Sequence, residues 1–339
     1  MTGQLEISRE ENLGIIALNR PEAINALNHE MIRGIIRTLE QWRDDDGIRV
    51  VLFEGRGARG FCAGGDVRAV RQLVLEGRAD EADNFFAAEY FMNGLIATFP
   101  KPTVALTHGI VMGGGIGIAG HCRYRISLGD GKWAMPEAAI GFVSDIGINH
   151  ILSKAPLSRA LAFLMTGATA NAAEAMSLGL LDGVVPPADR ELVLSDIAAA
   201  STARDADAAL VHLLQRRAVP PAGEDGSAIA AAAATDWTDF DAAVVALGPE
   251  RLSRGSPTSL FAIHASHLAA RRLPSIRDIL AVDLGLAQLL CRWPDFAEGV
   301  RAVLVDKDQR PNWQPPDLAG APAEAIRAAI AAVIGPKLV

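Results

Sequence analysis

The sequence predicts an α/β fold, in which short buried strands alternate with helices. Apolar runs typical of such strands occur at 50–53, 104–106 and 124–128. Each of the first two runs is followed by a glycine-rich turn and then by a helix-like segment. Units of this kind are joined by right-handed crossovers, because a right-twisted strand and a right-handed helix pack together only in that sense. We therefore expect an α/β core.

The N-terminal elements follow from local patterns. Residues 5–18 are expected to form two short strands joined by a turn at 11–14. Asn28 is the expected N-cap of a helix, since its side chain can accept from a free backbone N–H. The apolar side chains that follow recur with a period of 3.6 residues: Met31, Ile32, Ile35, Ile36, Leu39 and Trp42. Asp46–Gly47 ends this helix, and 48–53 is the next strand.

A second long helix is expected from about 80 to 97, where two prolines end it before the strand at Val104. The second glycine turn leads into a short helix and the strand 124–128, and further helical segments continue to about residue 200. The composition changes at 218–236, where prolines and glycines precede a run of alanines. We expect a flexible segment there that leads into a short alanine-rich helix.

These patterns divide the chain into a core at 1–200 and a mainly helical C-terminal region at 201–339. Half of the 339 residues are apolar, which is enough to bury a large core. The net charge of −8 and the pI near 5.4 argue against nucleic-acid binding. No apolar run reaches membrane-spanning length.

The three cysteines, Cys62, Cys122 and Cys291, are far apart and lack metal-ligand spacing, which indicates a reducing compartment without a disulfide framework. Residues 1–9 lack the pattern of a signal peptide. We therefore expect a cytoplasmic protein. Cys62 lies in the first glycine loop, but no His/Asn pattern supports it as a nucleophile.

Two glycine-rich loops carry the first functional signal. One comprises Phe61–Asp66 and the other His108–Gly117. Glycines let the backbone approach a ligand closely and direct N–H groups toward it. Two such loops can hold one oxyanion between two main-chain donors, which is the arrangement that acyl-transfer chemistry needs.

Carboxyl groups in apolar surroundings carry the second signal. Glu137 and Asp145 lie in the mostly apolar segment 133–145, and Glu89 lies among aromatic residues at 85–91. One interpretation is a surface loop in which Glu137 is solvated and Asp145 caps the next helix, with Glu89 on a solvated helix face. The other is burial, which raises the pKa of a carboxyl group and suits it to act as base or nucleophile.

Two further motifs give weaker signals. Gly115–Gly120 fits the G-x-G-x-x-G pattern of dinucleotide-binding loops. However, no acid ends the strand 124–128, and a dinucleotide site leaves the first glycine loop unexplained. His264 and His267 lack a third ligand at a convincing spacing, so we expect structural roles for them and no metal site.

Three segments in order resemble the crotonase (enoyl-CoA hydratase/isomerase) superfamily: Asn19–Leu27, Phe61–Asp66 and Gly113–Gly115. The resemblance covers roughly residues 5–200 and implies a spiral of ββα units. Within the superfamily, four further segments are similar to the 3-hydroxyisobutyryl-CoA hydrolase family: Glu89–Tyr90, Ala134–Glu137, Asp145–Gly147 and Asp295–Asp308. The last is the most discriminating, because ordinary hydratases end before it.

The resemblance implies roles for particular residues. The backbone N–H groups of Gly65 and Gly114 would form an oxyanion hole. Glu137 corresponds to the catalytic glutamate, Asp145 to a second acid, and Glu89 to a carboxylate at the substrate site. The path of the CoA moiety would run along backbone represented by Ala23, Ala63, Gly64, Asp66 and Val67.

The chain also departs from these families. Hydratases carry a second catalytic glutamate at the position of Gly117, and its absence favours hydrolysis. The hydrolases have proline where this chain has Ser144, and their glycine run is reduced to Gly147–Asn149. Both changes lie beside the acyl site, so the acyl group is less determined than the chemistry.

We therefore expect hydrolysis of a short 3-hydroxyacyl-CoA thioester, above all 3-hydroxyisobutyryl-CoA in valine breakdown. CoA would bind as part of the substrate, without a separate cofactor or metal. Glu137 would attack the thioester or activate water. The alternatives are an enoyl-CoA hydratase or isomerase and a non-catalytic acyl-CoA-binding protein. The resemblance also allows a homo-oligomer, a trimer or hexamer.

Overall fold

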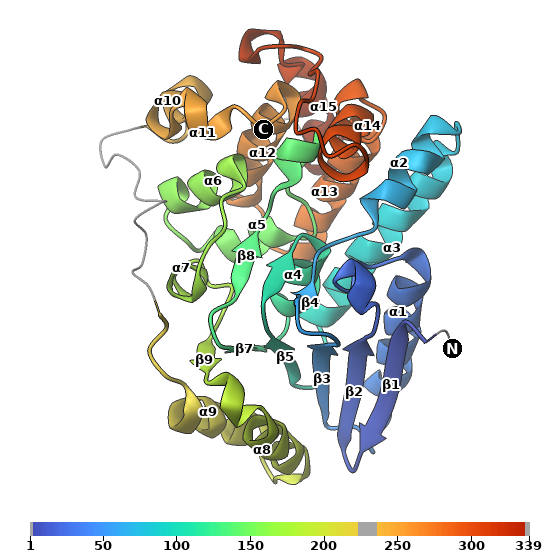
Figure 1. The fold of residues 1–339 in the computed structure, drawn as a ribbon, viewed down its shortest axis with the longest axis vertical. Coiled ribbons are helices and arrows are strands. Elements are labelled where there is room, and N and C mark those ends of the chain that lie inside the picture. Colours follow the sequence, from blue (N-terminus) through green and yellow to red (C-terminus); the bar gives the residue numbers. More distant parts are fainter. Residues whose placement is uncertain (1–2, 223–235, 336–339) are drawn as a thin grey trace. The chain divides into compact units, whose positions relative to one another are not determined.

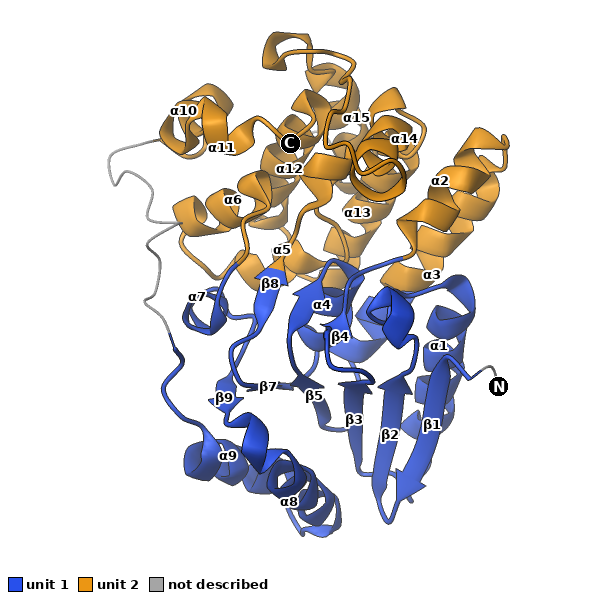
Figure 2. Ribbon diagram, in the orientation of Figure 1, with its two compact units in different colours: residues 1–65, 91–133, 170–225 blue, residues 66–90, 134–169, 226–339 orange. Residues whose placement is uncertain are grey.

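A computed structural model describes residues 3–222 and 236–335. The described chain forms two compact units, each assembled from three separate stretches of sequence (Figure 2). Unit 1 comprises residues 1–65, 91–133 and 170–225, and unit 2 comprises 66–90, 134–169 and 226–339. Most of the expected flexible segment at 218–236 and its alanine-rich helix lie outside the described residues.

The division into units differs from the expected boundary at residue 200. Residues 66–90 and 134–169 group with the C-terminal helices and not with the sheet. The reason is packing: α2 (Val67–Leu75) contacts α14 (Pro294–Val300), and α6 (Leu157–Thr166) contacts α12 (Pro257–Ala270). The expected helical C-terminal region is confirmed, but it is only part of its unit.

Unit 1 is built on a six-stranded sheet in the order β1-β2-β3-β5-β7-β9 (Figure 1). The bounds are β1 (Leu5–Glu10), β2 (Leu13–Leu18), β3 (Val50–Gly55), β5 (Thr103–Thr107), β7 (Tyr124–Leu128) and β9 (Gly183–Val185). β1 and β2 are antiparallel, and each later neighbour pairs in parallel. The predicted α/β class is therefore confirmed.

Helices of unit 1 bury the two faces of this sheet. Their bounds are α1 (His29–Arg43), α4 (Gly114–Ala119), α7 (Ala172–Ser177), α8 (Arg190–Thr202) and α9 (Ala206–Arg217), with 3-10 turns at Pro21–Ala23 and Pro187–Asp189. Side chains of α8 and α9 share one hydrophobic core with the strands; it includes Leu13, Leu52, Val104, Ile126, Ile197 and Leu213.

The predicted first helix is confirmed in detail. The Asn28 side chain accepts from the backbone N–H of Met31 at 2.9 Å, and the apolar stripe is buried apart from the half-buried Ile36. The turn between β1 and β2 is shorter than the expected 11–14. It consists of Glu11 and Asn12 alone, because Leu13 and Gly14 already belong to β2. At Gly14 the Trp42 ring occupies the space of a Cβ.

A second, three-stranded sheet has the order β4-β6-β8, from β4 (Gly60–Cys62), β6 (Ile110–Met112) and β8 (Lys132–Ala134). β4 and β6 are parallel neighbours. The glycine-rich ends of the two loops, 63–66 and 113–117, follow these strands directly, so the sheet brings both to the same edge.

Unit 2 is mainly helical. Besides α2, α6, α12 and α14, it contains α5 (Ile148–Leu152), α10 (Phe240–Leu247), α11 (Pro249–Leu252), α13 (Ile276–Leu290), α15 (Ala323–Ile334), the 3-10 turns η2 (Glu137–Ile140) and η5 (Leu318–Gly320), and a π-helical turn at Arg301–Val305. α3 (Ala79–Ala97) contributes its residues up to Tyr90 to this unit. Within the described ranges, no helix is long and apolar enough to cross a membrane.

Asn25 holds the segment that resembles a CoA-binding turn. It is fully buried and adopts φ +55°, a left-handed conformation that asparagine tolerates. Its Nδ2 donates to the carbonyl oxygens of Arg56 and Phe61, each at 2.9 Å, and its Oδ1 accepts from the N–H of Arg20 at 2.8 Å. One side chain thus joins the 19–27 segment to the ends of β3 and β4.

We expect Asn25→Ala to destabilise unit 1, because it leaves buried backbone groups unpaired in a conformation that alanine disfavours. The loss is about 1–3 kcal/mol for each such group. Urea denaturation measures it. Asn12→Ala is the matched control, since that half-buried amide donates one bond to Gly47 at 3.0 Å. Equal stability losses for the two variants would contradict the role assigned to Asn25.

Candidate functional site

The two glycine loops touch each other within unit 1. A Cβ added to Gly64, which has φ +116°, would lie 3.4 Å from the Met112 carbonyl oxygen and 3.6 Å from the Gly114 nitrogen. A Cβ on Gly115 would lie 2.4 Å from the Cys62 carbonyl oxygen, closer than real atoms approach. The close approach of the two backbones therefore requires glycine.

The N–H groups of Gly65 and Gly114 lie in these adjacent loops. Gly114 is the first residue of α4, where helix geometry supplies no acceptor for its N–H. Among the backbone hydrogen bonds of the described residues, neither N–H is a donor. Both are thus available to a ligand.

The residues expected along the CoA path divide between the units. In unit 1, Ala23 ends the Pro21–Ala23 turn, the N–H of Ala63 donates to Ile24 at 2.9 Å, and that of Leu27 donates to Gly64 at 2.8 Å. In unit 2, Asp66 caps α2 and Val67 begins it.

The dinucleotide interpretation does not fit the structure. Most of Gly115–Gly120 lies inside α4, whereas a dinucleotide-binding motif spans the turn before its helix. The Cys62 thiol is buried and donates to the Asn25 carbonyl oxygen at 3.2 Å.

Unit 2 buries the three expected carboxyl groups and brings them together. Glu89 is 3% exposed, Glu137 7% and Asp145 5%. Each interacts electrostatically with at least one of the others. The interpretation of these residues as solvated surface groups is therefore wrong, because helices far away in the sequence pack over them.

The turn that carries Glu137 is fixed by backbone contact with α14. Gly141 ends η2 with φ +69°, and a Cβ there would lie 2.1 Å from the Asp295 carbonyl oxygen. A Cβ on Gly299 would lie 2.4 Å from the Ile140 carbonyl carbon. The N–H of Ser256 also donates to Ala138 at 2.9 Å. The C-terminal helices thus hold Glu137 from two sides.

Aromatic rings make the surroundings of this turn apolar. The rings of Phe86 and Phe142 stack with centroids 5.0 Å apart, and Phe142 lies 5.4 Å from Phe296. Within this environment the Glu137 Oε2 and Glu89 Oε1 atoms are buried and have no hydrogen-bond partner among the described residues. Such groups are costly unless a ligand or water pairs with them.

Within the described residues, Asp145 differs from Glu89 and Glu137 in that its side chain accepts a hydrogen bond from another side chain. Its Oδ2 accepts a hydrogen bond from the Tyr90 hydroxyl, which lies on α3 beside Glu89. It belongs to a loop, and Gly147, not Asp145, is the N-cap of α5. The expected capping role of Asp145 is therefore wrong.

A fourth buried carboxyl group, Asp283 on α13, escaped the sequence analysis. It is fully buried and accepts from the N–H of Gly147 at 2.8 Å. A signal was present: Asp283 lies on the apolar stripe of its helix, three or four residues from Ile279, Leu280, Leu286 and Ala287. We call Glu89, Glu137, Asp145 and Asp283 the acid cluster.

Burial raises the pKa of every member of the acid cluster, and neighbouring carboxyl groups raise several of them further. For Glu137, Glu89 and Asp283, desolvation is the largest cause and the charge of Asp145 the next. Desolvation also raises the pKa of Asp145, but the hydrogen bond from Tyr90 opposes the shift. Burial and mutual repulsion therefore favour the protonated forms of these carboxyl groups, and the Tyr90 hydrogen bond favours the ionised form of Asp145.

The acid cluster is not arranged as a metal site. Across residues 3–222 and 236–335, no group of three or more His, Cys, Asp or Glu is placed to hold a metal ion. His267 Nδ1 lies 2.8 Å from the Asn149 side-chain oxygen, and His264 Nε2 lies 3.1 Å from the Trp237 carbonyl oxygen. His267 Nε2 is buried and has no hydrogen-bond partner among the described residues.

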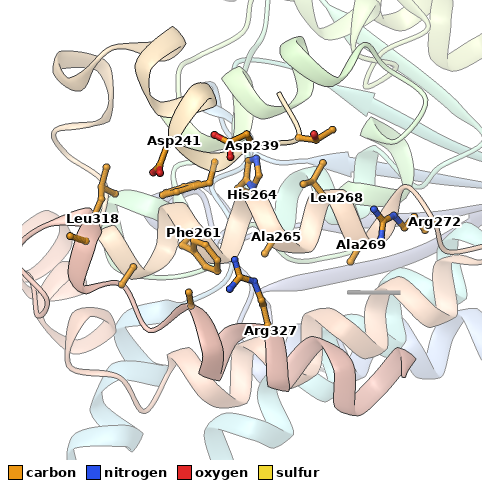
Figure 3. A pocket seen from close by; sticks show the side chains of 15 residues that line it. Asp239, Asp241, Phe261, His264, Ala265, Leu268, Ala269, Arg272, Leu318 and Arg327 are labelled. Carbon is orange, nitrogen blue, oxygen red and sulfur yellow. The ribbon is translucent and has the colours of Figure 1, made fainter. Parts of the chain in front are cut away.

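Unit 2 also has a surface cavity of about 560 Å³ between α10, α12 and α15. Figure 3 shows Arg327 beside Phe261, with its guanidinium carbon 5.0 Å from the ring centroid. The charged side chains Asp239, Asp241 and Arg327 are exposed, so water already solvates them. The acid cluster is the stronger candidate, because its unpaired groups are buried.

The fold agrees with the comparisons. The chain belongs to the enoyl-CoA hydratase/isomerase family, whose profile matches residues 13–330. It is 34% identical to a Danio rerio protein named 3-hydroxyisobutyryl-CoA hydrolase, mitochondrial, over 91% of this chain and 84% of the relative.

Two solved structures share the whole fold. A carnitinyl-CoA dehydratase from Mycobacterium thermoresistibile is 32% identical, with a TM-score of 0.84 and coverage of 97% of this chain and 96% of that one. An enoyl-CoA hydratase from Rhodobacter sphaeroides is 31% identical, with a TM-score of 0.81 and coverage of 98% of both chains. The expected crotonase fold is therefore confirmed.

Glu89→Gln should stabilise the protein more at pH 8 than at pH 5. The folded state keeps the Glu89 proton above the usual pKa of 4.5, whereas the unfolded state loses it. Stability therefore falls as the pH rises through this window, and glutamine removes that loss. Thermal unfolding at both pH values measures the effect.

The control for this prediction is Glu81→Gln on the same helix. Glu81 is exposed and paired with Arg78, so its replacement should give no gain that grows with pH. A Glu89→Gln variant whose melting temperature differs from wild type equally at both pH values would contradict the raised pKa.

Proposed function

We propose that this protein hydrolyses a short 3-hydroxyacyl-CoA thioester, with 3-hydroxyisobutyryl-CoA as the first candidate. The observation that carries the proposal is Glu137, a buried carboxyl group that has an oxygen without a partner among the described residues and that interacts electrostatically with Asp145 and Glu89. The name of the 34%-identical relative supports the same substrate and reaction. Gly117 also occupies the position where hydratases carry their second glutamate.

The residues take the following roles in this proposal. The ionised Glu137 attacks the thioester carbonyl carbon, and the N–H groups of Gly65 and Gly114 stabilise the negative charge that develops on oxygen. The carbon–sulfur bond breaks, and Asp145 or Glu89 protonates the departing thiolate. Water then cleaves the mixed anhydride and regenerates the carboxylate.

A second route uses the same groups. Glu137 takes a proton from a water molecule whose oxygen attacks the carbonyl, and no covalent intermediate forms. Both routes consume one water and release one thiol. Both need the carboxylate form of Glu137, whose pKa is raised, and the first also needs the proton of Asp145 or Glu89. Activity should therefore rise with pH as Glu137 ionises and fall again once that acid has lost its proton. In either route CoA enters as part of the substrate. A cytoplasmic location, the absence of a resident cofactor and a trimeric or hexameric assembly belong to the proposal as well.

A second candidate function is hydration or dehydration of an enoyl or hydroxyacyl-CoA. The two solved structures at 31–32% identity, named a carnitinyl-CoA dehydratase and an enoyl-CoA hydratase, favour it. The acid cluster offers Glu89 or Asp145 as the second acid. Thiol release from 3-hydroxyisobutyryl-CoA and loss of the enoyl absorbance of crotonyl-CoA, followed separately, distinguish the two reactions. A protein that binds both esters and turns over neither is an acyl-CoA-binding protein.

Glu137→Gln should lower kcat at least about 100-fold and leave KM nearly unchanged. Glutamine keeps the shape of glutamate but is neither a base nor an effective nucleophile. Steady-state thiol release measures kcat, and calorimetric titration measures substrate binding directly. The matched control is Glu174→Gln, because Glu174 is equally buried but belongs to the capping box of α7. Retention of more than about a tenth of kcat by Glu137→Gln would exclude Glu137 as the catalytic group.

The enzyme should prefer 3-hydroxyisobutyryl-CoA to isobutyryl-CoA by a large factor in kcat/KM. Buried polar groups that pair with a substrate hydroxyl reject analogues without it, by 10⁴-fold or more in favourable cases. Glu89→Leu should reduce this preference, chiefly by slowing the hydroxylated ester. Equal use of the two esters by the wild type would mean that the unpaired Glu89 oxygen serves another purpose.

A further inference from the structure

Asp283 meets the loop of Asp145 through a backbone hydrogen bond. Its Oδ2 accepts from the N–H of Gly147, two residues after Asp145, and both groups are buried. Its Oδ1 is also buried and has no partner among the described residues. A carboxyl group in the middle of an apolar helix stripe costs stability, so packing alone does not account for it.

The backbone that Asp283 holds is strained. Ile146 has φ +57° and Gly147 has φ +71°, so two consecutive residues are left-handed. For a β-branched residue such as isoleucine this conformation is a genuine outlier. Strained backbone persists where surrounding contacts determine it. The contacts here include the N–H of Ile148, which donates to the Asp145 carbonyl oxygen at 3.0 Å, and the N–H of Gly147, which donates to Asp283. The turn in question carries Asp145 at its start.

The electrostatic surroundings of Asp283 are acidic. The charge of Asp145 raises the pKa of Asp283, and the charge of Asp283 in turn raises the pKa of Tyr90. Titratable or charged groups on the elements packed against α13 are His264 and His267 on α12, His150 on α5, and Glu324 and Arg327 on α15. None of these groups is among the causes of the raised pKa of Asp283. Burial and the charge of Asp145 therefore raise the pKa of Asp283, and the hydrogen bond from the Gly147 N–H opposes that shift.

We propose that Asp283 is a positioning residue for the reaction. Its Oδ2 accepts from the N–H of Gly147, holds the left-handed turn at Ile146–Gly147, and thereby orients Asp145 toward Tyr90 and the substrate. It does not touch the reacting atoms. This inference rests on the proposed function only for its kinetic consequence, since the geometry of the turn exists without substrate.

The test compares Asp283→Asn, Asp283→Leu and the control Asp278→Asn. Asparagine retains a carbonyl oxygen for the Gly147 N–H, whereas leucine fills the space without an acceptor. Asp278 lies in the first turn of the same helix and binds the Ser275 hydroxyl at 2.6 Å, away from the acid cluster. Unfolding by heat first establishes which variants are folded.

We expect kcat to fall in Asp283→Leu and to be largely retained in Asp283→Asn. Asp283→Leu should lower kcat per folded molecule at least about 10-fold with little change in KM, because small displacements of a catalytic group have large effects on rate. Asp283→Asn should retain at least about a third of kcat and the pH profile of the wild type. Wild-type kcat in folded Asp283→Leu overturns the proposal. A loss in Asp283→Asn as large as in Asp283→Leu overturns it too, as does a displaced pH profile.

A second measurement needs no substrate. The chain has two tyrosines, Tyr90 and Tyr124, so the ¹³Cζ resonance of labelled Tyr90 is identified by comparison with Tyr124→Phe. The resonance reports the hydrogen bond from Tyr90 to Asp145. It should move in Asp283→Leu and stay in place in Asp283→Asn and Asp278→Asn. An unmoved resonance in Asp283→Leu contradicts the positioning role, whatever reaction the protein catalyses, whereas a wild type that releases no thiol contradicts only the proposed function.

Discussion

Desolvation of carboxyl groups is the interaction on which the candidate site depends. Glu89, Glu137, Asp145 and Asp283 are buried together, and burial is the largest cause of each raised pKa. Burial without compensating cations destabilises the fold, and natural proteins keep such arrangements mainly where a function requires them. The same desolvation makes a carboxylate reactive once it has lost its proton. Stability and reactivity therefore oppose each other in unit 2.

The C-terminal helices complete this site and do more than cover it. α14 meets the Glu137 turn at Gly141 and Gly299, where neither position has room for a Cβ. α13 supplies Asp283, which holds the Asp145 loop. The segment 295–308, on which the resemblance to the hydrolases rested most strongly, thus has a physical role: it fixes the backbone that carries Glu137.

In unit 1 the corresponding constraint is steric. The parallel pairing of β4 and β6 brings the two glycine loops so close that a backbone oxygen occupies the place of a side chain at Gly115, while Gly64 adopts φ +116°. The tight approach leaves the N–H groups of Gly65 and Gly114 without backbone acceptors among the described residues. Unpaired donors on a rigid backbone are what stabilisation of an oxyanion requires.

The sequence by itself determined the features that local patterns encode. The alternation of strands and helices gave the α/β class, the 3.6-residue period gave α1 with its Asn28 cap, and the motifs identified Glu137 and the glycine loops. Tertiary structure alone decided which stretches group into units, that Glu89 and Asp145 are buried, and that Asp283 joins them. The reason is that burial and electrostatic coupling depend on contacts between residues far apart in the chain. Asp283 accepts from Gly147, 136 positions away, and no periodicity in either segment encodes that bond.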